Sequence, residues 1–417
     1  MKFGEFFRQF FKKDVFSWAL FDFANSSHVT MILSFVFPIY FKEIIAGAQY
    51  GDFYWGLIGS LSVLLAGFVS PVIGAVADYD SRKKIKFIWC VLLSVVATAL
   101  LFFSSSGTLI FASLVFIASN FFLLLSQSLY DSFLSHVSTK KNAGSISGFG
   151  YALGYLGGIV TMLLMKPLYV NGYGGEYELL YKLTFALTAL FFLIFSIPAF
   201  IYFKDKGKKN NKSESLWELS KIGFRNTFLA FKEFRKEKHL AWFLVAFYFM
   251  NDALVTIFAF ISLYGVGTLN LTMSQMGLIF IILQVIAFPS SILCGWFADK
   301  FGQRRILLFT LFIWVVITLL LTFAHTWSTF LIIAVLTGLV LGGSQSVARS
   351  WFSNIVPDKK RFVLFGFNSF ASKISAAIGP VLFGAVSSFT GNQRLAMFVL
   401  VPFFVISWII FYNIKEE

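Results

Sequence analysis

The chain has 417 residues, of which 58% are hydrophobic and only 13% charged, and its mean hydropathy is +0.79. A soluble domain carries about 25% charged residues, so this composition excludes an ordinary soluble protein. The net charge of +14 is also typical of nucleic-acid-binding proteins, and its distribution along the chain decides between that class and a membrane protein.

Long apolar stretches recur along the whole chain. A bilayer core requires roughly 20 apolar residues per helix. The runs between polar breaks predict an all-α membrane protein with twelve transmembrane helices, at residues 16–45, 53–77, 85–105, 108–134, 145–168, 180–203, 241–266, 275–297, 305–324, 328–350, 363–389 and 394–414.

The chain opens with an amphipathic segment, residues 1–14. Its phenylalanines fall on one helical face and its basic residues face away from them. This pattern is typical of a helix that lies flat on the inner leaflet, so we interpret the segment as an anchor and not as a site.

The first span carries a polar stripe of Asp22, Asn25, Ser26 and His28 in an otherwise apolar helix. Asp22 and Ser26 are one turn apart and share a face, so the stripe is expected to face the protein interior. An acid at the middle of a span costs about 2.5–3.5 kcal/mol on insertion scales. Asp22 therefore needs a partner, a proton or water.

Five charged residues fall within the predicted spans: Asp22, Asp131, Asp252, Arg349 and Lys373. Their added insertion costs, on the order of 12–17 kcal/mol, exceed a typical net folding stability of about 5–15 kcal/mol. They must pair with one another, be neutralised or face water. Structural ion pairs would meet this requirement, and so would a polar transport path.

An eleven-residue pattern follows the second span and occurs again 221 residues downstream. Residues 74–84 read G-A-V-A-D-Y-D-S-R-K-K, and residues 295–305 read G-W-F-A-D-K-F-G-Q-R-R. In each copy a Gly permits close helix contact, an Asp is suited to cap the next helix, and basic residues hold the loop in the cytoplasm. The motif residues are Gly74, Asp78, Arg82, Lys83, Gly295, Asp299, Arg304 and Arg305.

The chain turns polar at residues 204–240, which separates two bundles at 15–203 and 241–417. The run K-D-K-G-K-K-N-N-K-S-E-S is a charged linker. Ser215 and Glu218 then form a capping box that opens a basic amphipathic helix.

The second half of the chain repeats the first. S-Q-S-V-A-R-S at 344–350 matches S-Q-S-L-Y-D-S at 126–132 with an offset of 218, so Arg349 takes the place of Asp131. We therefore predict two pseudo-symmetric six-helix bundles with a site between them near the bilayer midplane.

Basic residues lie almost entirely on one side of this topology. If the N-terminus is cytoplasmic, the loops and the linker on that side hold most of the Lys and Arg, and only Lys42, Lys166, Lys182 and Arg394 fall outside. This asymmetry predicts that both termini are cytoplasmic, in the inner membrane if the cell is bacterial. The charge then belongs to topology and to anionic lipid head groups, and no nucleic-acid partner is expected.

The repeated loop resembles the signature between helices two and three of the major facilitator superfamily, and its second copy resembles the weaker version between helices eight and nine. Within that superfamily, further stretches look like the Atg22-like family of amino-acid effluxers. These are W-A-L-F-D-F-A-N-S-S, G-F-G-Y-A-L-G-Y-L-G-G, F-Y-F-M-N-D-A and S-Q-S-V-A-R-S. The resemblance implies the major facilitator fold, with helices one, four, seven and ten lining a central cavity.

We predict a secondary transporter that moves a small polar solute by alternating access. The resemblance implies amino acids as substrates, and a desolvated Asp22 or Asp252, or His28, is a candidate for proton coupling. Asp131 and Arg349 are predicted to form an ion pair that closes the inner gate. The predicted binding and coupling residues are Asp22, Asn25, His28, Asn120, Gln127, Asn251, Asp252, Gln284 and Lys373. The protein is expected to be a monomer without cofactor or metal.

Two alternatives remain at this point. A receptor or scaffold on a transporter fold would be favoured by a large soluble domain, whereas the longest extramembrane piece is a linker of about 37 residues. A lipid or drug translocator is a narrower alternative, which a charged cavity disfavours. An enzyme is not expected, because the sequence has no phosphate-binding glycine loop, no HExxH and no nucleophile motif.

Overall fold

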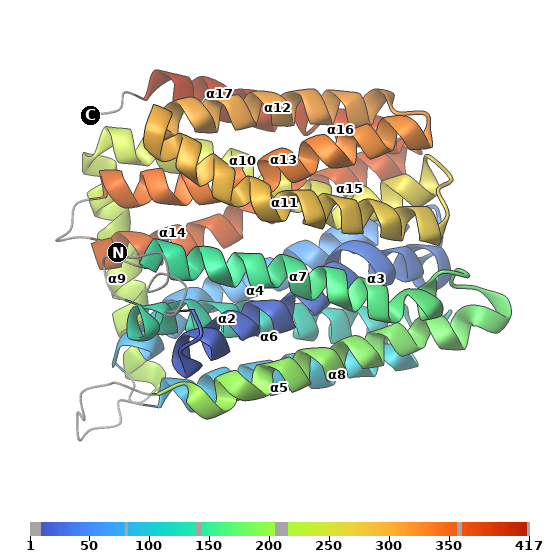
Figure 1. The fold of residues 1–417 in the computed structure, drawn as a ribbon, viewed down its shortest axis with the longest axis horizontal. Coiled ribbons are helices and arrows are strands. Elements are labelled where there is room, and N and C mark those ends of the chain that lie inside the picture. Colours follow the sequence, from blue (N-terminus) through green and yellow to red (C-terminus); the bar gives the residue numbers. More distant parts are fainter. Residues whose placement is uncertain (1–9, 80–81, 139–142, 205–215, 357–360, 415–417) are drawn as a thin grey trace.

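The computed structural model describes residues 10–79, 82–138, 143–204, 216–356 and 361–414, and these residues are almost entirely helical (Figure 1). Within this part of the chain, twelve helical segments are long and apolar enough to cross a bilayer. Each predicted span falls on one of them. The predicted all-α fold with twelve transmembrane helices is therefore confirmed.

The first six spans form one layer, coloured blue to green in the lower part of Figure 1. Their elements are α2 (Lys13–His28), η1 (Val29–Phe35), α3 (Val36–Tyr40) and η2 (Phe41–Ala46) in span one, then α4 (Gly51–Tyr79), α5 (Lys83–Leu100) with η3 (Leu101–Phe103), α6 (Leu109–Val137), α7 (Ala143–Tyr169), and η4 (Gly175–Tyr177) with α8 (Glu178–Tyr202).

The last six spans form the second layer, coloured yellow to red in the upper part of Figure 1. Their elements are α10 (Lys238–Gly267), α11 (Met273–Phe301), α12 (Gln303–Phe323), α13 (Trp327–Ile355), α14 (Arg361–Ser375) with α15 (Ile378–Thr390), and α16 (Gln393–Phe398) with α17 (Val401–Asn413).

Spans one, eleven and twelve are interrupted away from their ends, which the hydropathy pattern did not predict, and each interruption lies beside a proline. Proline has no N–H to donate to the carbonyl four residues earlier. For Pro380 that carbonyl belongs to Ala376, where the turn between α14 and α15 lies. For Pro402 it belongs to Phe398, the last residue of α16, and for Pro38 it belongs to Ser34, within the π-helical η1.

The predicted amphipathic helix of the linker is present as α9 (Leu216–Lys236). It runs across the ends of the spans, roughly perpendicular to them (Figure 1). Ser215 of the expected capping box and most of the N-terminal amphipathic segment lie outside the described residues. Of that segment, Phe10 is buried and its ring stacks on Phe149 at 4.7 Å between centroids.

We distinguish the two ends of the bundle by the position of α9. The start of α2, the end of α17 and α9 lie at one end, called here the α9 face (Figure 1). The loops after η2, α7, α10 and α15 lie at the other end, called the opposite face.

The two repeated loops anchor to equivalent helix ends. Lys84 donates from Nζ to the carbonyl of Ile201 near the end of α8, at 3.2 Å. In the second half, Arg304 donates to the carbonyls of Phe411 and Tyr412 near the end of α17. Cations at the last carbonyls of a helix satisfy acceptors that lack intrahelical partners and complement the helix dipole. The same basic cluster therefore performs the same anchoring task in both halves.

The structure does not show the roles expected for the acids and glycines of the motif, which were helix capping and close helix contact. Asp78 and Asp299 lie in the last turns of α4 and α11, and their side chains are outside the described set. Arg82 and Gly302 are the N-cap residues of α5 and α12. A Cβ at Gly74 or Gly295 would meet no described atom within 4 Å, so close helix contact is not seen at these two glycines.

Candidate functional site

A polar cluster lies between the two layers, toward the α9 face. Its first member is Asp22, nine residues into α2 and so roughly 14 Å from the start of that helix. One carboxylate oxygen of Asp22 accepts a hydrogen bond from the Tyr130 hydroxyl at 2.7 Å, and the other accepts one from Asn25 at 3.3 Å. Trp18 stacks on the Tyr130 ring at 4.6 Å. These contacts fix the direction of the Asp22 carboxylate.

Gly150 of α7 allows Asp22 to occupy this position. A Cβ at Gly150 would come within 2.5 Å of an Asp22 carboxylate oxygen and 2.9 Å of the Trp18 ring. Only glycine leaves room for α2 and α7 to pack this closely.

Lys373 brings the second layer into the cluster. It lies twelve residues into α14, roughly 18 Å along that helix. Its ammonium donates to Ser128 of α6 at 2.7 Å and to Ser70 of α4 at 3.0 Å, so one side chain from the second half contacts two helices of the first. Ser70 and Ser128 are therefore part of the site, although the sequence pattern did not indicate them.

Asp131 and Arg349 lie nearer the α9 face, each six residues before the end of its helix. Both are exposed, although they lie in apolar helices. The Arg349 guanidinium lies over the Tyr151 ring at 5.2 Å. Asp131 is close enough to interact electrostatically with Arg349, Lys373 and Asp22. Among the described residues, no ion pair within 4 Å joins Asp131 to Arg349, so the predicted gate pair is not formed in this conformation.

The exposure of this cluster is explained by the spacing of the helices that carry it. Over their described residues, α6 and α13 are not among the helix pairs in extensive contact. The two layers touch instead through α4 with α14 and α15, and through α7 with α11. This spacing leaves the Asp131 and Arg349 side chains exposed.

The opposite face is closed by contacts between the two layers. There η1 and α3 pack against α10, and Trp55 donates from its indole to the Ala259 carbonyl at 2.8 Å. A Cβ at Gly56 would overlap the Pro380 carbonyl oxygen, and one at Gly384 would overlap the Asp52 carbonyl oxygen. Glycines thus permit α4 and α15 to meet directly.

A buried ion pair lies within this closed region. The Lys42 ammonium is 3.0 Å and 3.1 Å from the two carboxylate oxygens of Asp52, and both residues are buried. The same carboxylate accepts hydrogen bonds from Ser387 at 2.5 Å and Gln393 at 2.8 Å. Gln393 in turn accepts one from Thr268 at 2.6 Å. This Lys42–Asp52 network joins the two layers at the opposite face.

Comparisons with known proteins agree with this architecture. A model of the Major Facilitator Superfamily matches residues 2–162. A model of the family described as "Vacuole effluxer Atg22 like" matches residues 135–417, well over half of the chain. The chain belongs to the Atg22-like family. It is accordingly a transporter of the major facilitator type and an integral, multi-pass membrane protein, as the sequence motifs indicated.

Relatives of this Atg22-like chain fall into two groups. The "Uncharacterized MFS-type transporter YxiO" of Bacillus subtilis is 27% identical over 98% of this chain and 96% of its own length. "Autophagy-related protein 22" of Yarrowia lipolytica is 26% identical over 61% of this chain and 47% of its own length. The chain thus spans about half the length of such Atg22 proteins.

Two solved structures share the fold. One is a point mutant of the nucleoside transporter NupG, with a TM-score of 0.72 at 14% identity, covering 97% of this chain and 99% of that one. The other is a bacterial homologue of the iron transporter ferroportin, with a TM-score of 0.60 at 13% identity and the same coverage. At these identities the match concerns the fold alone.

A second acid of the Atg22-like chain, Asp252, occupies a different position from Asp22. Both of its carboxylate oxygens accept from the backbone N–H of Gly379, at 2.9 Å and 3.0 Å. Gly379 is the second residue of α15, where the unpaired N–H groups and the helix dipole favour a negative charge. A Cβ at Gly379 would come within 2.9 Å of the carboxylate, so glycine permits this approach.

The remaining predicted site residues are spread over the bundle. His28 is fully buried inside the first layer, where its Nε2 lies 2.7 Å from the Ser119 hydroxyl. Asn120 donates to Ser62 at 2.6 Å in the same layer. Three others lie nearer the second layer or the cluster: Gln284, buried beside Gly158 of α7; Asn251, which donates to the Ser372 carbonyl at 3.4 Å; and Gln127, half-buried on α6 next to Ser128.

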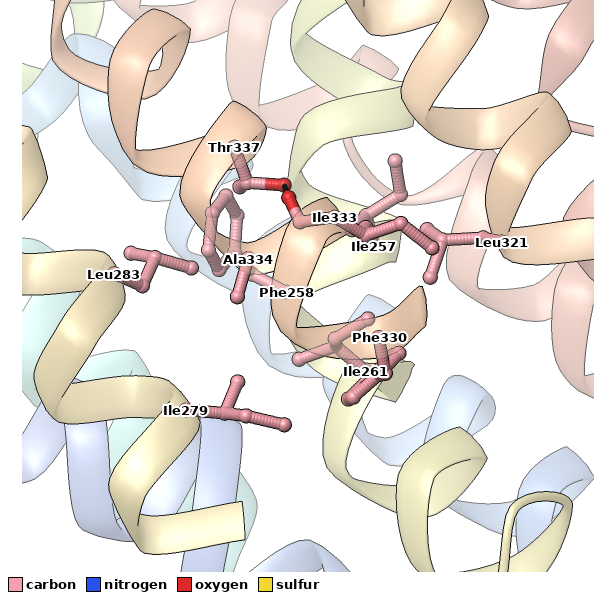
Figure 2. Close-up of a pocket in the computed structure, with 10 residues that line it drawn as sticks. All are labelled: Ile257, Phe258, Ile261, Ile279, Leu283, Leu321, Phe330, Ile333, Ala334 and Thr337. Atoms are coloured by element: carbon pink, nitrogen blue, oxygen red, sulfur yellow. Dashed lines mark hydrogen bonds between the residues drawn. The ribbon is translucent and has the colours of Figure 1, made fainter. Parts of the chain in front are cut away.

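A small cavity in the second layer is not suited to bind a solute. It has a volume of about 20 Å³ and lies among α10, α11, α12 and α13. Figure 2 shows that its lining is apolar apart from Thr337, whose hydroxyl donates to the Ile333 carbonyl at 2.8 Å. This space holds about one water molecule and offers no converging polar groups. It is a packing gap within the second layer.

Proposed function

We propose that this Atg22-like protein is a proton-coupled secondary transporter for small zwitterionic solutes of the amino-acid type. The observation that carries the proposal is the gathering of acids and bases from both layers in one cluster, in which Asp131 and Arg349 are exposed and Asp22 and Lys373 half-buried. Asp22 comes from α2, Asp131 from α6, Arg349 from α13 and Lys373 from α14. A carboxylate and an ammonium on one small molecule need one partner of each sign, and this cluster supplies both.

The proposal assigns a side to each face. Basic residues of the repeated loops and of α9 lie at the α9 face, which the positive-inside rule makes cytoplasmic. With this orientation, the structure represents an inward-open state. In it α6 and α13 stand apart at the cytoplasmic end, and the Lys42–Asp52 network closes the outer end. Alternating access requires these two conditions to exchange.

In this proposal Lys373 holds the solute carboxylate and Asp22 holds its ammonium group. Both are oriented by hydroxyl groups, Ser70 and Ser128 for Lys373 and Tyr130 for Asp22. Asp252 is proposed as the coupling group, because a proton on its carboxyl group would cancel a charge that is 2% exposed and bonded to a helix N-terminus.

A ligand screen tests the substrate class. We expect amino acids to raise the Tm of the purified protein, and sugars, nucleosides and drugs to leave it unchanged. Lys373→Met should abolish the shift, because the carboxylate loses its cation. Lys166→Met is the matched control, since Lys166 is exposed at the far end of α7. A shift with nucleosides alone, or an amino-acid shift that survives in Lys373→Met, would contradict the assignment.

The gate proposal concerns Asp131 and Arg349. When the cavity closes toward the cytoplasm, α6 and α13 approach and the two opposite charges are expected to pair. Reversing either charge alone, Asp131→Arg or Arg349→Asp, should reduce transport in proteoliposomes because two like charges then meet. The double reversal should restore a large part of the rate. Failure of the double variant to recover, with the protein folded, would argue against an ion-pair gate.

A further inference from the structure

The linker helix α9 has three distinct faces. Leu219, Ile222, Gly223 and Asn226 point toward the bundle and are buried or half-buried. Trp217, Phe224, Phe228 and Phe231 are spaced by seven, four and three residues, so they form one exposed aromatic stripe. Lys221, Arg225 and Lys232 are spaced by four and seven residues and form an exposed cationic stripe beside it. Such adjacent stripes are typical of helices that lie in a membrane interface.

The two stripes are in direct contact. The Lys221 ammonium lies 5.2 Å from the centre of the Trp217 ring, and the Lys232 ammonium lies 4.8 Å from that of Phe228. Among the side chains of α9 that the structure describes, Glu218 is the one exposed acid. Three cations against one acid give this surface a net positive charge at the edge of a large aromatic area, with Trp217 70% exposed and Phe228 57% exposed.

The depth of α9 follows from its contact with α4. Gly223 lies directly against Pro71, and a Cβ there would overlap the Pro71 carbonyl oxygen. Pro71 is 20 residues from Gly51 at the other end of α4, which corresponds to about 30 Å along the helix. That length equals the thickness of a bilayer hydrocarbon core, roughly 30 Å. The helix therefore crosses α4 at the level where acyl chains give way to phosphate headgroups.

We infer that α9 is a binding surface for a bilayer leaflet that carries anionic phosphate headgroups. The aromatic stripe inserts among the upper acyl chains, and Lys221, Arg225 and Lys232 pair with headgroup phosphates. Because α9 also packs against α4 of the first layer and α14 of the second, the lipid surface holds a helix that contacts both moving halves. This inference does not depend on the identity of the transported solute.

Tryptophan quenching in vesicles tests the surface. The full chain is reconstituted in phosphatidylcholine–phosphatidylglycerol vesicles in which either lipid carries brominated acyl chains. The chain has ten tryptophans, so the Trp217 signal is the difference between the wild-type protein and Trp217→Phe. We expect brominated phosphatidylglycerol to quench Trp217 roughly twice as efficiently as brominated phosphatidylcholine, because cations enrich anionic lipid around α9.

Matched variants separate the two stripes. Lys221→Gln/Arg225→Gln/Lys232→Gln should remove the preference for phosphatidylglycerol, whereas Lys300→Gln/Arg305→Gln, exposed cations elsewhere at the α9 face, should preserve it. Trp89, 59% exposed on α5, serves as the reference for lipid contact. The inference is overturned if neither lipid quenches Trp217 while both quench Trp89, since another protein or water would then cover the stripe. Equal quenching of Trp217 by the two lipids would also overturn it, because the surface would lack anion selectivity.

Discussion

We expect Asp252→Asn to reduce proton-driven transport in proteoliposomes to background while exchange of labelled for unlabelled solute continues. The side chain keeps its size, and its amide oxygen still accepts from the Gly379 N–H, so the junction between α10 and α15 is retained. What is lost is the negative charge that a proton would neutralise. During exchange the protein moves between its two states only with solute bound. Residue 252 therefore does not have to gain or lose a proton.

Two comparisons make this result specific. Asp14→Asn removes an exposed acid in the first turn of α2 and should leave both activities unchanged. Gly379→Ala places a Cβ against the Thr256 hydroxyl with overlap and should lower both activities together with the Tm, because it separates the helices. If Asp252→Asn transports at the wild-type rate under a proton gradient, Asp252 is not the coupling group. If exchange is lost as well with the Tm unchanged, Asp252 acts in solute binding.

The fold was predictable because its signals are long and redundant. Twelve apolar runs and a charge distribution with one basic side determine spans almost independently of packing. The irregularities in spans one, eleven and twelve were not predicted. Hydropathy is an average over many side chains, so it does not register the one backbone N–H that is missing at Pro38, Pro380 or Pro402. Proline alone gave no usable signal, because Pro71, Pro167, Pro198 and Pro289 lie within uninterrupted helices.

The site was predictable only in part. Charges in apolar helices stand out in a sequence, and Asp22, Asp131, Arg349 and Lys373 do come together. Hydroxyl residues are common in membrane helices, so Ser70, Ser128 and Tyr130 gave no comparable signal, although two of them lie in the repeated S-Q-S-L-Y-D-S stretch.

Helix periodicity also does not tell which side of a helix faces a neighbour in the same layer. His28 was grouped with Asp22 in one stripe, yet six residues along the regular helix α2 turn it about 120° away from Asp22, so it points into the first layer toward Ser119. Asp52 and Lys42 were missed as a site, because both lie near span ends, where charges are ordinary. Only the folded chain reveals that they are buried together.

The Lys42–Asp52 network yields the second large expected effect. Lys42→Met leaves Asp52 as an uncompensated buried charge at the closed opposite face, which costs on the order of 3–5 kcal/mol. Opening that face hydrates the carboxylate, so the equilibrium between the two states should shift toward the open one by a factor on the order of 10² to 10⁴. Spin labels at Tyr50→Cys and Phe389→Cys, in a background without Cys90 and Cys294, report this opening as a longer distance. Lys182→Met, a cation beside Phe102 of the same layer, should leave the distance unchanged.

Adding Asp52→Asn to Lys42→Met removes the stranded charge and should return the distance toward the closed value. A distance that stays short in folded Lys42→Met would show that the apolar and glycine contacts of α4 with α15 alone keep the outer end closed.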